Sequence, residues 1–184
     1  TVQDSFLSFD VFEKSRRTSS KRIEDIYPAG NESILIGTQS QGIKLFDIRT
    51  STYEDVLSHD SDNSELFVRD FVHSRANEYW VATESGLFIY DLASRKYVNL
   101  RKQYNNPYSI SDNAVYSLCV DREGGVWAGT YFGGVNYFPK QYISFEKFFP
   151  GSNENSISGN AVREICKDRN GSLWIGTEDA GLNK

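Results

Sequence analysis

The chain has 184 residues and a formal net charge of −5, which argues against a nucleic-acid partner because such a surface would need a basic patch. Aromatic residues make up 14% of the sequence, and 14 glycines accompany only 4 prolines, a composition typical of many strands joined by tight turns. No stretch approaches the roughly 18 consecutive apolar residues of a membrane-spanning helix, so we expect this chain to make no contact with a membrane.

A segment of five residues recurs four times and sets the period of the chain. Its copies are ILIGT at 34–38, YWVAT at 79–83, VWAGT at 126–130 and LWIGT at 173–177. Their small residues, Gly37, Ala82, Gly129 and Gly176, follow one another at intervals of 45, 47 and 47 residues. Fourteen residues before each small residue stands a branched aliphatic anchor: Ile23, Val68, Val115 and Val162. A period in the forties indicates a solenoid or a propeller, in which each unit buries a face against the next.

In chain order, the first expected element is a strand at 5–13, whose spacing before the first repeat fits the fourth strand of a unit. The first two repeats then each contain four strand-like segments, IEDIY, SILIG, GIKLFD and TYEDVL, followed by VRDFV, EYWVA, LFIYD and KYVNL. The third repeat contains AVYSLCVD, VWAG, VNYF and an alternating segment at 143–149. The fourth stops at GLNK, when its third strand has barely begun.

Four antiparallel strands in about 47 residues describe a propeller blade. We therefore predict an all-β fold, a partial β-propeller of four-stranded antiparallel blades, with three complete blades and an unfinished fourth. The expected divisions are an outer strand and linker of a preceding or closing blade at 1–22, then blades at 23–67, 68–113, 114–160 and 161–184.

The two ends of the chain leave two arrangements open. The chain is either a fragment that forms an open arc, or a ring of four blades closed by pairing of residues 5–13 with 181–184. An open arc has an uncovered apolar face at each end, and such faces bind partners. The expected partners are the remaining blades and domains of a parent chain, or a second copy of this chain in a homodimer.

The third and fourth repeats carry a resemblance to a known family. AVYSLCVDREGGVWAGTYFGGV at 114–135 and AVREICKDRNGSLWIGTEDAGL at 161–182 resemble two-component regulator propeller repeats. The linkers NPYSISDNAV at 106–115 and ENSISGNAV at 154–162 resemble the inter-blade segment of that family. The resemblance covers most of residues 23–184 and is weaker in the first two repeats, where Leu35 replaces the Trp and Ala82 the Gly.

The resemblance implies a location and a function. In that family the repeats form two successive seven-bladed propellers, the periplasmic sensor of inner-membrane hybrid two-component histidine kinases of Bacteroidetes. Those sensors detect oligosaccharides from complex glycans and signal to the transcription of glycan-use genes. Seven blades need roughly 330 residues, so this chain would supply about half of one propeller.

Tyr131 and Phe132 are the candidate ligand-binding residues that depart most from the repeat. They occupy the turn between second and third strands, where the other copies place polar residues, such as Glu84 and Glu178. Such turns share a face with the loops that link blades, and function in repeat folds concentrates in loops on one face. The linker before the third repeat contains Tyr104, Asn106 and other amides; an exposed aromatic pair beside them would suit sugar stacking and hydrogen bonding.

The alternative is that Tyr131 and Phe132 pack on a neighbouring blade or on a partner domain. The tryptophans of the repeat, at 80, 127 and 174, are expected in the core between blades, since each lies within an apolar strand. Cys119 and Cys166 occupy equivalent strand positions and are expected to be buried and unbridged.

We expect no catalytic site, metal site or cofactor in this chain. His59 and His73 are isolated, and no cysteine or histidine cluster matches a metal site. No pair of carboxylates stands out from the solvated surface as a glycosidase pair would. Two other functions remain open: a protein-interaction propeller scaffold, and the propeller domain of a glycan-cleaving hydrolase.

Overall fold

The computed structural model describes residues 6–12, 20–140, 148–151 and 156–184, and these residues form fourteen strands and no helix. The chain divides into two compact units, Thr1–Tyr142 and Ile143–Lys184. All strand pairings within the described sheets are antiparallel, so the predicted all-β class is confirmed.

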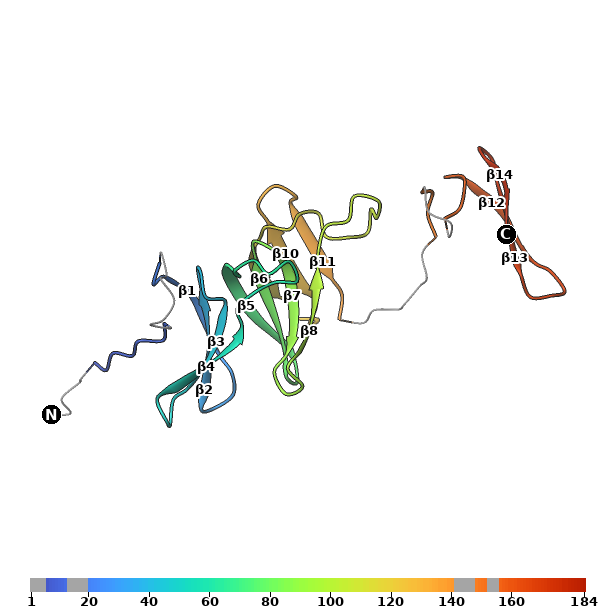
Figure 1. Cartoon of the computed structure of the whole chain (residues 1–184). Helices are drawn as coiled ribbons and strands as arrows, with labels where there is room; N and C mark the ends of the chain where they lie inside the picture. The colour runs from blue at the N-terminus through green and yellow to red at the C-terminus, as the bar shows by residue number, and fades with distance from the viewer. Residues whose placement is uncertain (1–5, 13–19, 141–147, 152–155) are drawn as a thin grey trace. The chain divides into compact units, whose positions relative to one another are not determined.

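The first unit contains three sheets (Figure 1). In the first sheet the strands follow the chain order: β1 (Ile23–Pro28), β2 (Ser33–Thr38), β3 (Ile43–Asp47) and β4 (Thr52–Leu57). The second sheet repeats that order: β5 (Val68–Arg75), β6 (Glu78–Thr83), β7 (Gly86–Asp91) and β8 (Lys96–Leu100). The third contains β9 (Val115–Val120), β10 (Val126–Thr130) and β11 (Val135–Phe138). The sheets therefore have the meander topology expected of propeller blades.

The fourth strand predicted for the third repeat, at 143–149, lies mostly outside the described residues. Of that segment only Phe148 and Phe149 are described, and neither belongs to a strand.

A threonine closes the turn between second and third strands in every sheet of the first unit. Thr38, Thr83 and Thr130 pair with the anchor residues that begin β1, β5 and β9. We call these three strands, the first of each sheet, the inner strands. Each hydroxyl donates a hydrogen bond across its own turn, to the carbonyl of Gly42, Gly86 or Gly134, at 2.7 to 2.9 Å. All three glycines have positive φ, which Gly adopts without steric cost. The final threonine of the five-residue segment thus ends the second strand and stabilises the turn that follows it.

Apolar side chains from neighbouring sheets form the core of the first unit. Leu35 and Ile43 of the first sheet are buried in one cluster with Val68 and Phe71 of β5. A second cluster repeats this arrangement one sheet later, with Trp80, Ala82 and Leu87 against Val115 and Leu118 of β9. Burial of each such side chain contributes about 1.5–3 kcal/mol, so the packing between sheets is a major source of stability.

Gly37 explains why a small residue recurs in the repeat. A Cβ atom built at Gly37 would lie 2.5 Å from Val68 Cγ1 and 2.8 Å from Phe71 Cε2, so the neighbouring sheet leaves no room for a side chain. The second sheet places Ala82 at the equivalent position, where it is fully buried. Close approach of the next inner strand therefore selects for Gly or Ala.

The N-terminal segment corrects one prediction. A strand was expected at 5–13, but residues 6–12 form no strand in the structure. Val11 and Phe12 are instead buried against Ile36 and Phe46, and the Phe9 ring lies 5.1 Å from that of Phe46. Apolar contact with the first sheet, without a hydrogen-bonded ladder, holds this segment in place.

The second unit contains one sheet of β12 (Val162–Lys167), β13 (Leu173–Thr177) and β14 (Gly181–Asn183), in that order. Its first turn is closed by Asp168, whose carboxylate accepts hydrogen bonds from the N–H groups of Asn170 and Ser172. The turn contains Asn170 and Gly171, and Gly171 has a positive φ, as is common in tight hairpin turns.

The tryptophans and cysteines do not all lie where the repeat predicted. Trp80 is 8% exposed, but Trp127 is 44% exposed and packs on Tyr137 with ring centroids 4.4 Å apart. Cys119, paired with Trp127 in the ladder, is also exposed, as is Cys166. The expectation of buried cysteines is therefore wrong, because strand alternation places Cys119 on the face opposite to buried Leu118.

Candidate functional site

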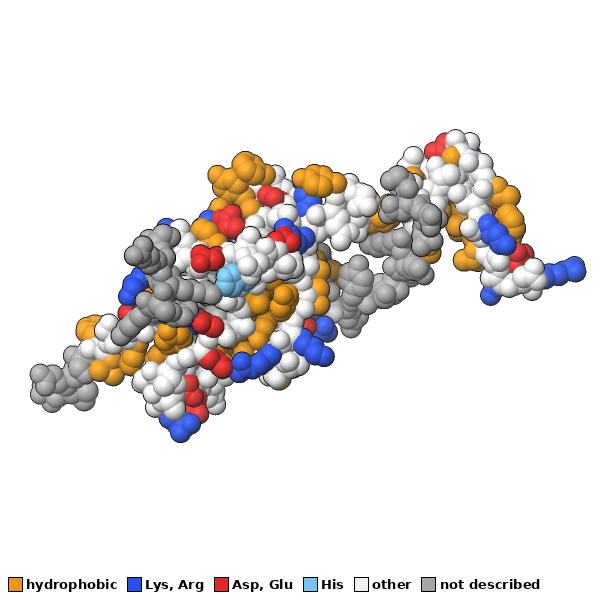
Figure 2. Space-filling view, viewed as in Figure 1, with side chains coloured by type: hydrophobic (Ala, Val, Ile, Leu, Met, Phe, Trp, Pro, Cys, Tyr) orange, Lys and Arg blue, Asp and Glu red, His pale blue; other side chains and the backbone are white. Residues whose placement is uncertain are grey.

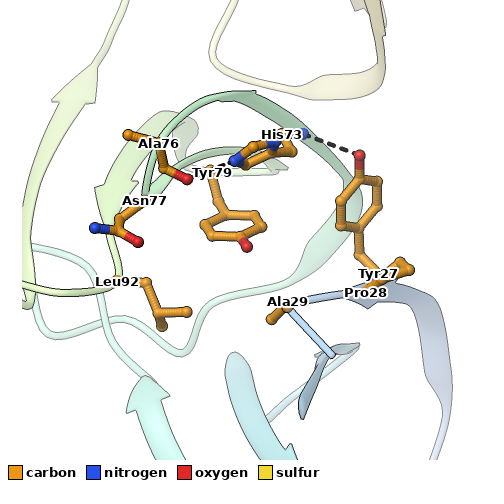
Figure 3. Close-up of a pocket in the computed structure, with 9 residues that line it drawn as sticks. Tyr27, Pro28, Ala29, His73, Ala76, Asn77, Tyr79 and Leu92 are labelled. Carbon is orange, nitrogen blue, oxygen red and sulfur yellow. Dashed lines mark hydrogen bonds between the residues drawn. The ribbon is translucent and has the colours of Figure 1, made fainter. Parts of the chain in front are cut away.

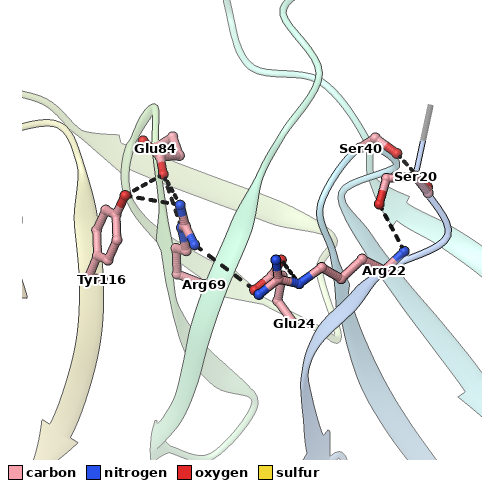
Figure 4. A network of polar contacts seen from close by, with 7 residues as sticks. All are labelled: Ser20, Arg22, Glu24, Ser40, Arg69, Glu84 and Tyr116. Carbon is pink, nitrogen blue, oxygen red and sulfur yellow. Dashed lines mark hydrogen bonds and ion pairs between the residues drawn. The ribbon is translucent and has the colours of Figure 1, made fainter. Parts of the chain in front are cut away.

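A polar network connects all three sheets of the first unit where their inner strands begin (Figure 4). Arg69 Nε donates a hydrogen bond to Glu84 Oε1 at 3.0 Å, and Arg69 Nη1 lies 4.0 Å from Glu24 Oε2. Arg22 Nε lies 2.8 Å from the other oxygen of Glu24. The Tyr116 hydroxyl donates to Glu84 at 2.9 Å and accepts from Arg69 at 3.0 Å.

The network follows directly from the repeat. Glu24, Arg69 and Tyr116 each stand one residue after the anchor of their inner strand, so the three strands present them in register. Glu84 and Tyr131 are likewise equivalent, each the first residue after the threonine that ends the second strand. Consequently Arg69 meets Glu84 in the second sheet as Tyr116 meets Tyr131 in the third. In the second unit Arg163 and Glu178 occupy the same two positions and form an ion pair.

An exposed aromatic surface adjoins this network. The Tyr131 ring stacks on Tyr116 at 5.1 Å, with an interplanar angle of 25°, and the Phe132 ring meets Tyr131 edge-on at 4.3 Å. Tyr116, Tyr131 and Phe132 are 36%, 59% and 87% exposed. We call these three rings the aromatic surface. Figure 2 shows that hydrophobic side chains are exposed on the visible face of the molecule, among acidic and basic side chains.

Backbone contacts hold the turn that carries two of these rings. The N–H of Phe132 donates to Asp112 Oδ2 at 3.0 Å, and the N–H of Tyr131 donates to the carbonyl of Ala114 at 2.9 Å. The hydrogen bond from Phe132 lowers the pKa of Asp112 below its usual range. The hydrogen bond to Glu84 raises the pKa of Tyr116. At neutral pH Asp112 is therefore ionised, and Tyr116 keeps its proton for Glu84.

The four predicted ligand-binding residues come from two segments, the turn after β10 and the linker between β8 and β9. Tyr131 and Phe132 are exposed, one of the two alternatives left open by the sequence, and their rings contact each other and Tyr116. Tyr104 is 96% exposed, with Lys102 Nζ 5.5 Å from its ring centroid. Neither Tyr131 nor Phe132 lines the pocket that contains Asn106. Their role in ligand binding stays a prediction.

Asn106 lines a pocket of about 330 Å³ in the linker between the second and third sheets. Its lining is rich in amides, with two aromatic rings and one guanidinium: Asn99, Leu100, Arg101, Gln103, Asn106, Tyr108, Ser109, Ile110 and Phe138. The Asn106 side chain is already engaged, since Nδ2 donates to Gln103 at 3.3 Å and Oδ1 accepts from the N–H of Tyr108 at 2.9 Å. These contacts order the linker beside the pocket.

A second pocket, of about 550 Å³, lies at the other ends of β1 and β5 (Figure 3). The N–H of His73 donates to the Tyr27 hydroxyl at 3.2 Å, and His73 Nε2 lies 2.7 Å from the carbonyl of Ala76. Burial raises the pKa of Tyr79, which also lines it. Because its lining contains no carboxylate, this pocket lacks the acid and base pair of a glycosidase.

Arg69, Glu84 and Tyr116 were not among the residues predicted from the sequence to form a functional site. Their common position, one residue after an anchor or after the turn threonine, could have identified them as one group. Among the described residues no cluster of three or more His, Cys, Asp or Glu side chains could hold a metal ion. The described part of the chain also contains no helix long and apolar enough to span a membrane.

Antiparallel sheets that repeat along the chain and pack on one another through their inner strands define a partial β-propeller, the predicted fold. Residues 109–132 and 156–179 match the family model described as the two component regulator propeller. The chain therefore carries two component regulator propeller repeats, and the resemblance seen in the sequence is confirmed.

Solved structures from B. thetaiotaomicron are similar to this chain. The extracellular domain of BT3049, described as a hybrid two component system, is 31% identical over 88% of this chain, with a TM-score of 0.60. The extracellular domain of BT4673, described in one structure as a one component system, is 25% identical over 93% of this chain, with a TM-score of 0.53. This chain spans only 20% and 22% of the length of those two chains. We found no match among curated proteins.

Proposed function

We propose that this chain is part of the extracytoplasmic ligand-sensing propeller of an inner-membrane hybrid two-component sensor histidine kinase. The similarity to extracellular domains of such systems supports this assignment and a periplasmic location. The propeller itself performs no catalysis in this proposal; it binds a ligand and passes the binding energy to the rest of the parent protein.

The ligand that we propose is an oligosaccharide, detected so that transcription of glycan-use genes can respond. The observation that carries this proposal is the aromatic surface of Tyr116, Tyr131 and Phe132. A sugar ring can stack on exposed aromatic faces, while polar groups at their edge fix its orientation by hydrogen bonds. The Glu84 carboxylate, 34% exposed, lies at that edge.

Titration calorimetry of the purified protein with a panel of oligosaccharides tests the proposal. Changing both Tyr131 and Phe132 to Ser should weaken binding at least tenfold, because the stacking surface is lost. Phe6→Ser is the matched control, since that ring is fully exposed in the N-terminal segment. Tyr104→Ser and Asn106→Ala show whether the linker residues also contribute. If no oligosaccharide binds, or the double variant binds unchanged, the sugar-binding assignment of this surface is wrong.

A further inference from the structure

The guanidinium of Arg69 lies close to two aromatic rings and two carboxylates. Its central carbon lies 3.8 Å from the ring centroid of Phe67 and 4.2 Å from that of Tyr116. Glu84 occupies one edge and Glu24 faces another, and the side chain of Arg69 is only 20% exposed. Glu84 therefore occupies the edge formed by Nε and Nη2, where an anion could otherwise form a bidentate pair with Arg69.

Three carboxylates and three basic side chains lie in the network beside the aromatic surface, and each basic group lies near a carboxylate: Arg22 near Glu24, Arg69 near Glu84 and Lys102 near Asp112. Arg69 is shared by Glu84 and Glu24, and Arg22 pairs with Glu24 as well. Asp112 adds a third carboxylate directly behind the Phe132 turn. The Glu84 carboxylate is 34% exposed at the edge of this surface, and the Arg69 guanidinium is already paired with it, so like-charge repulsion from Glu84 would oppose the binding of an acidic ligand there.

We infer that the aromatic surface takes uncharged oligosaccharides, and that Glu84 determines this specificity by holding Arg69. This inference rests on the proposed function, whose ligand class it narrows. A neutral sugar can stack on Tyr131 and Phe132 and donate a hydroxyl to the remaining acceptor capacity of Glu84. An acidic sugar would have to displace Glu84 from Arg69, which would leave a carboxylate without its partner. Specificity of this kind comes from the penalty imposed on the wrong ligand.

The experiment compares two oligosaccharides that differ in one charge. One is a neutral tetrasaccharide that binds the protein, and the other carries a uronic acid in place of its terminal hexose. Calorimetric titration should show about tenfold weaker binding of the acidic member, and an affinity for the neutral member that does not change between low and high salt.

Glu84→Gln should change this preference, because it removes one carboxylate and frees one edge of Arg69. We expect the ratio of the two affinities to move about tenfold toward the acidic oligosaccharide, whose binding should become dependent on salt. Glu178→Gln is the matched control: it removes the equivalent turn carboxylate in the second unit and should leave both affinities unchanged. If Glu84→Gln does not fold, Glu84→Asp, which withdraws the carboxylate by one methylene, should shift the preference in the same direction.

The outcomes separate the two levels of the proposal. Equal or tighter binding of the acidic oligosaccharide by the unmodified protein overturns this inference but not the oligosaccharide function. An unchanged preference in folded Glu84→Gln also overturns the role of Glu84. Absence of binding by both oligosaccharide series overturns the proposed function and, with it, this inference.

Discussion

Asp70 accepts a hydrogen bond from the backbone N–H of Leu118 at 2.6 Å, across 48 residues of sequence. Asp25 makes the equivalent contact one sheet earlier, accepting from the N–H of Phe71 at 3.1 Å across 46 residues. Both carboxylates stand two residues after an anchor, where the inner strand is bulged. The same position in successive repeats thus links each inner strand to the next, beside the apolar clusters that pack them.

Removing this link should destabilise the first unit. Asp70→Ala leaves the N–H of Leu118 without its partner, which costs about 1–3 kcal/mol in the free energy of unfolding. Urea denaturation measures the loss. The control is Asp62→Ala, which removes only an exposed ion pair with Arg101 and should cost less than about 1 kcal/mol. Equal stability of Asp70→Ala and the unmodified protein would show that the link contributes nothing.

The same carboxylate predicts a pH dependence of stability. Burial raises the pKa of Asp70 above its ordinary value of 3.8, and the nearby Asp25 charge raises it further, although the N–H groups of Leu118 and Phe71 oppose the shift. The folded state therefore binds more protons than the unfolded state between 3.8 and the raised pKa. This contribution to stability is full below the ordinary pKa and is lost as the pH rises through the folded pKa.

Asp70→Asn removes this titration and provides the reference. The free energy of unfolding of the unmodified protein, relative to that of Asp70→Asn, should fall as the pH rises from about 3.8, then become constant. Urea denaturation at a series of pH values gives both curves. A difference that stays flat or rises across this range would show that the pKa of Asp70 is not raised.

Gly37 should be intolerant of even one methyl group. Gly37→Ala places a Cβ atom 2.5 Å from Val68 Cγ1, so the sheets must separate, and overpacking of this kind costs about 1–3 kcal/mol. Gly176→Ala is the control at the same repeat position, where the nearest atoms, in Glu164, lie 3.9 Å from the new Cβ. Thermal unfolding should separate the two variants. Similar melting temperatures would contradict the close approach of β5 to β2.

Two tryptophans at the same repeat position should respond differently to truncation. Trp80→Ala removes a buried ring that packs on Phe138 at 5.1 Å, and should cost about 3–5 kcal/mol. Trp127→Ala removes a ring that is 44% exposed, and should cost clearly less. Urea denaturation of both variants tests this difference. Equal losses would indicate that Trp127 is covered in solution, as the repeat by itself predicts.

The exposed face of the third sheet should cause self-association. Trp127, Val135 and Tyr137 are 44%, 66% and 45% exposed on β10 and β11, and an apolar patch of this kind binds partners. Light scattering should show an average mass that rises with protein concentration. Changing Trp127 and Val135 to Ser should reduce the association, whereas Ile48→Ser, at an exposed turn of the first sheet, should not. A monomer at all concentrations would contradict this prediction.

Local sequence determined the strands and turns of this protein. The five-residue segment ends in a threonine that closes a glycine turn, and residues four apart are enough to define that turn, as Thr38 and Gly42 show. Strand type and turn position depend on neighbours in sequence, so the repeat predicted the described strands of the sheets and the small residue at Gly37, whereas the strand predicted at 5–13, outside the repeats, is not formed by residues 6–12. The sequence also singled out Tyr131 and Phe132, because they replace polar turn residues, but it left open whether the two rings are exposed or packed on a neighbouring blade.

Tertiary structure decided which side chains meet and which remain exposed. Tyr116 reaches Glu84 across 32 residues, and Arg69 reaches Tyr116 across 47, through sheets that pack only when the whole unit forms. The sequence pattern could not predict that Val11 and Phe12 pack on the first sheet without forming a hydrogen-bonded strand. It also could not predict that Cys119 lies on the exposed face of the third sheet. These outcomes depend on which face of each strand a neighbour covers, and that is a property of the packed sheets.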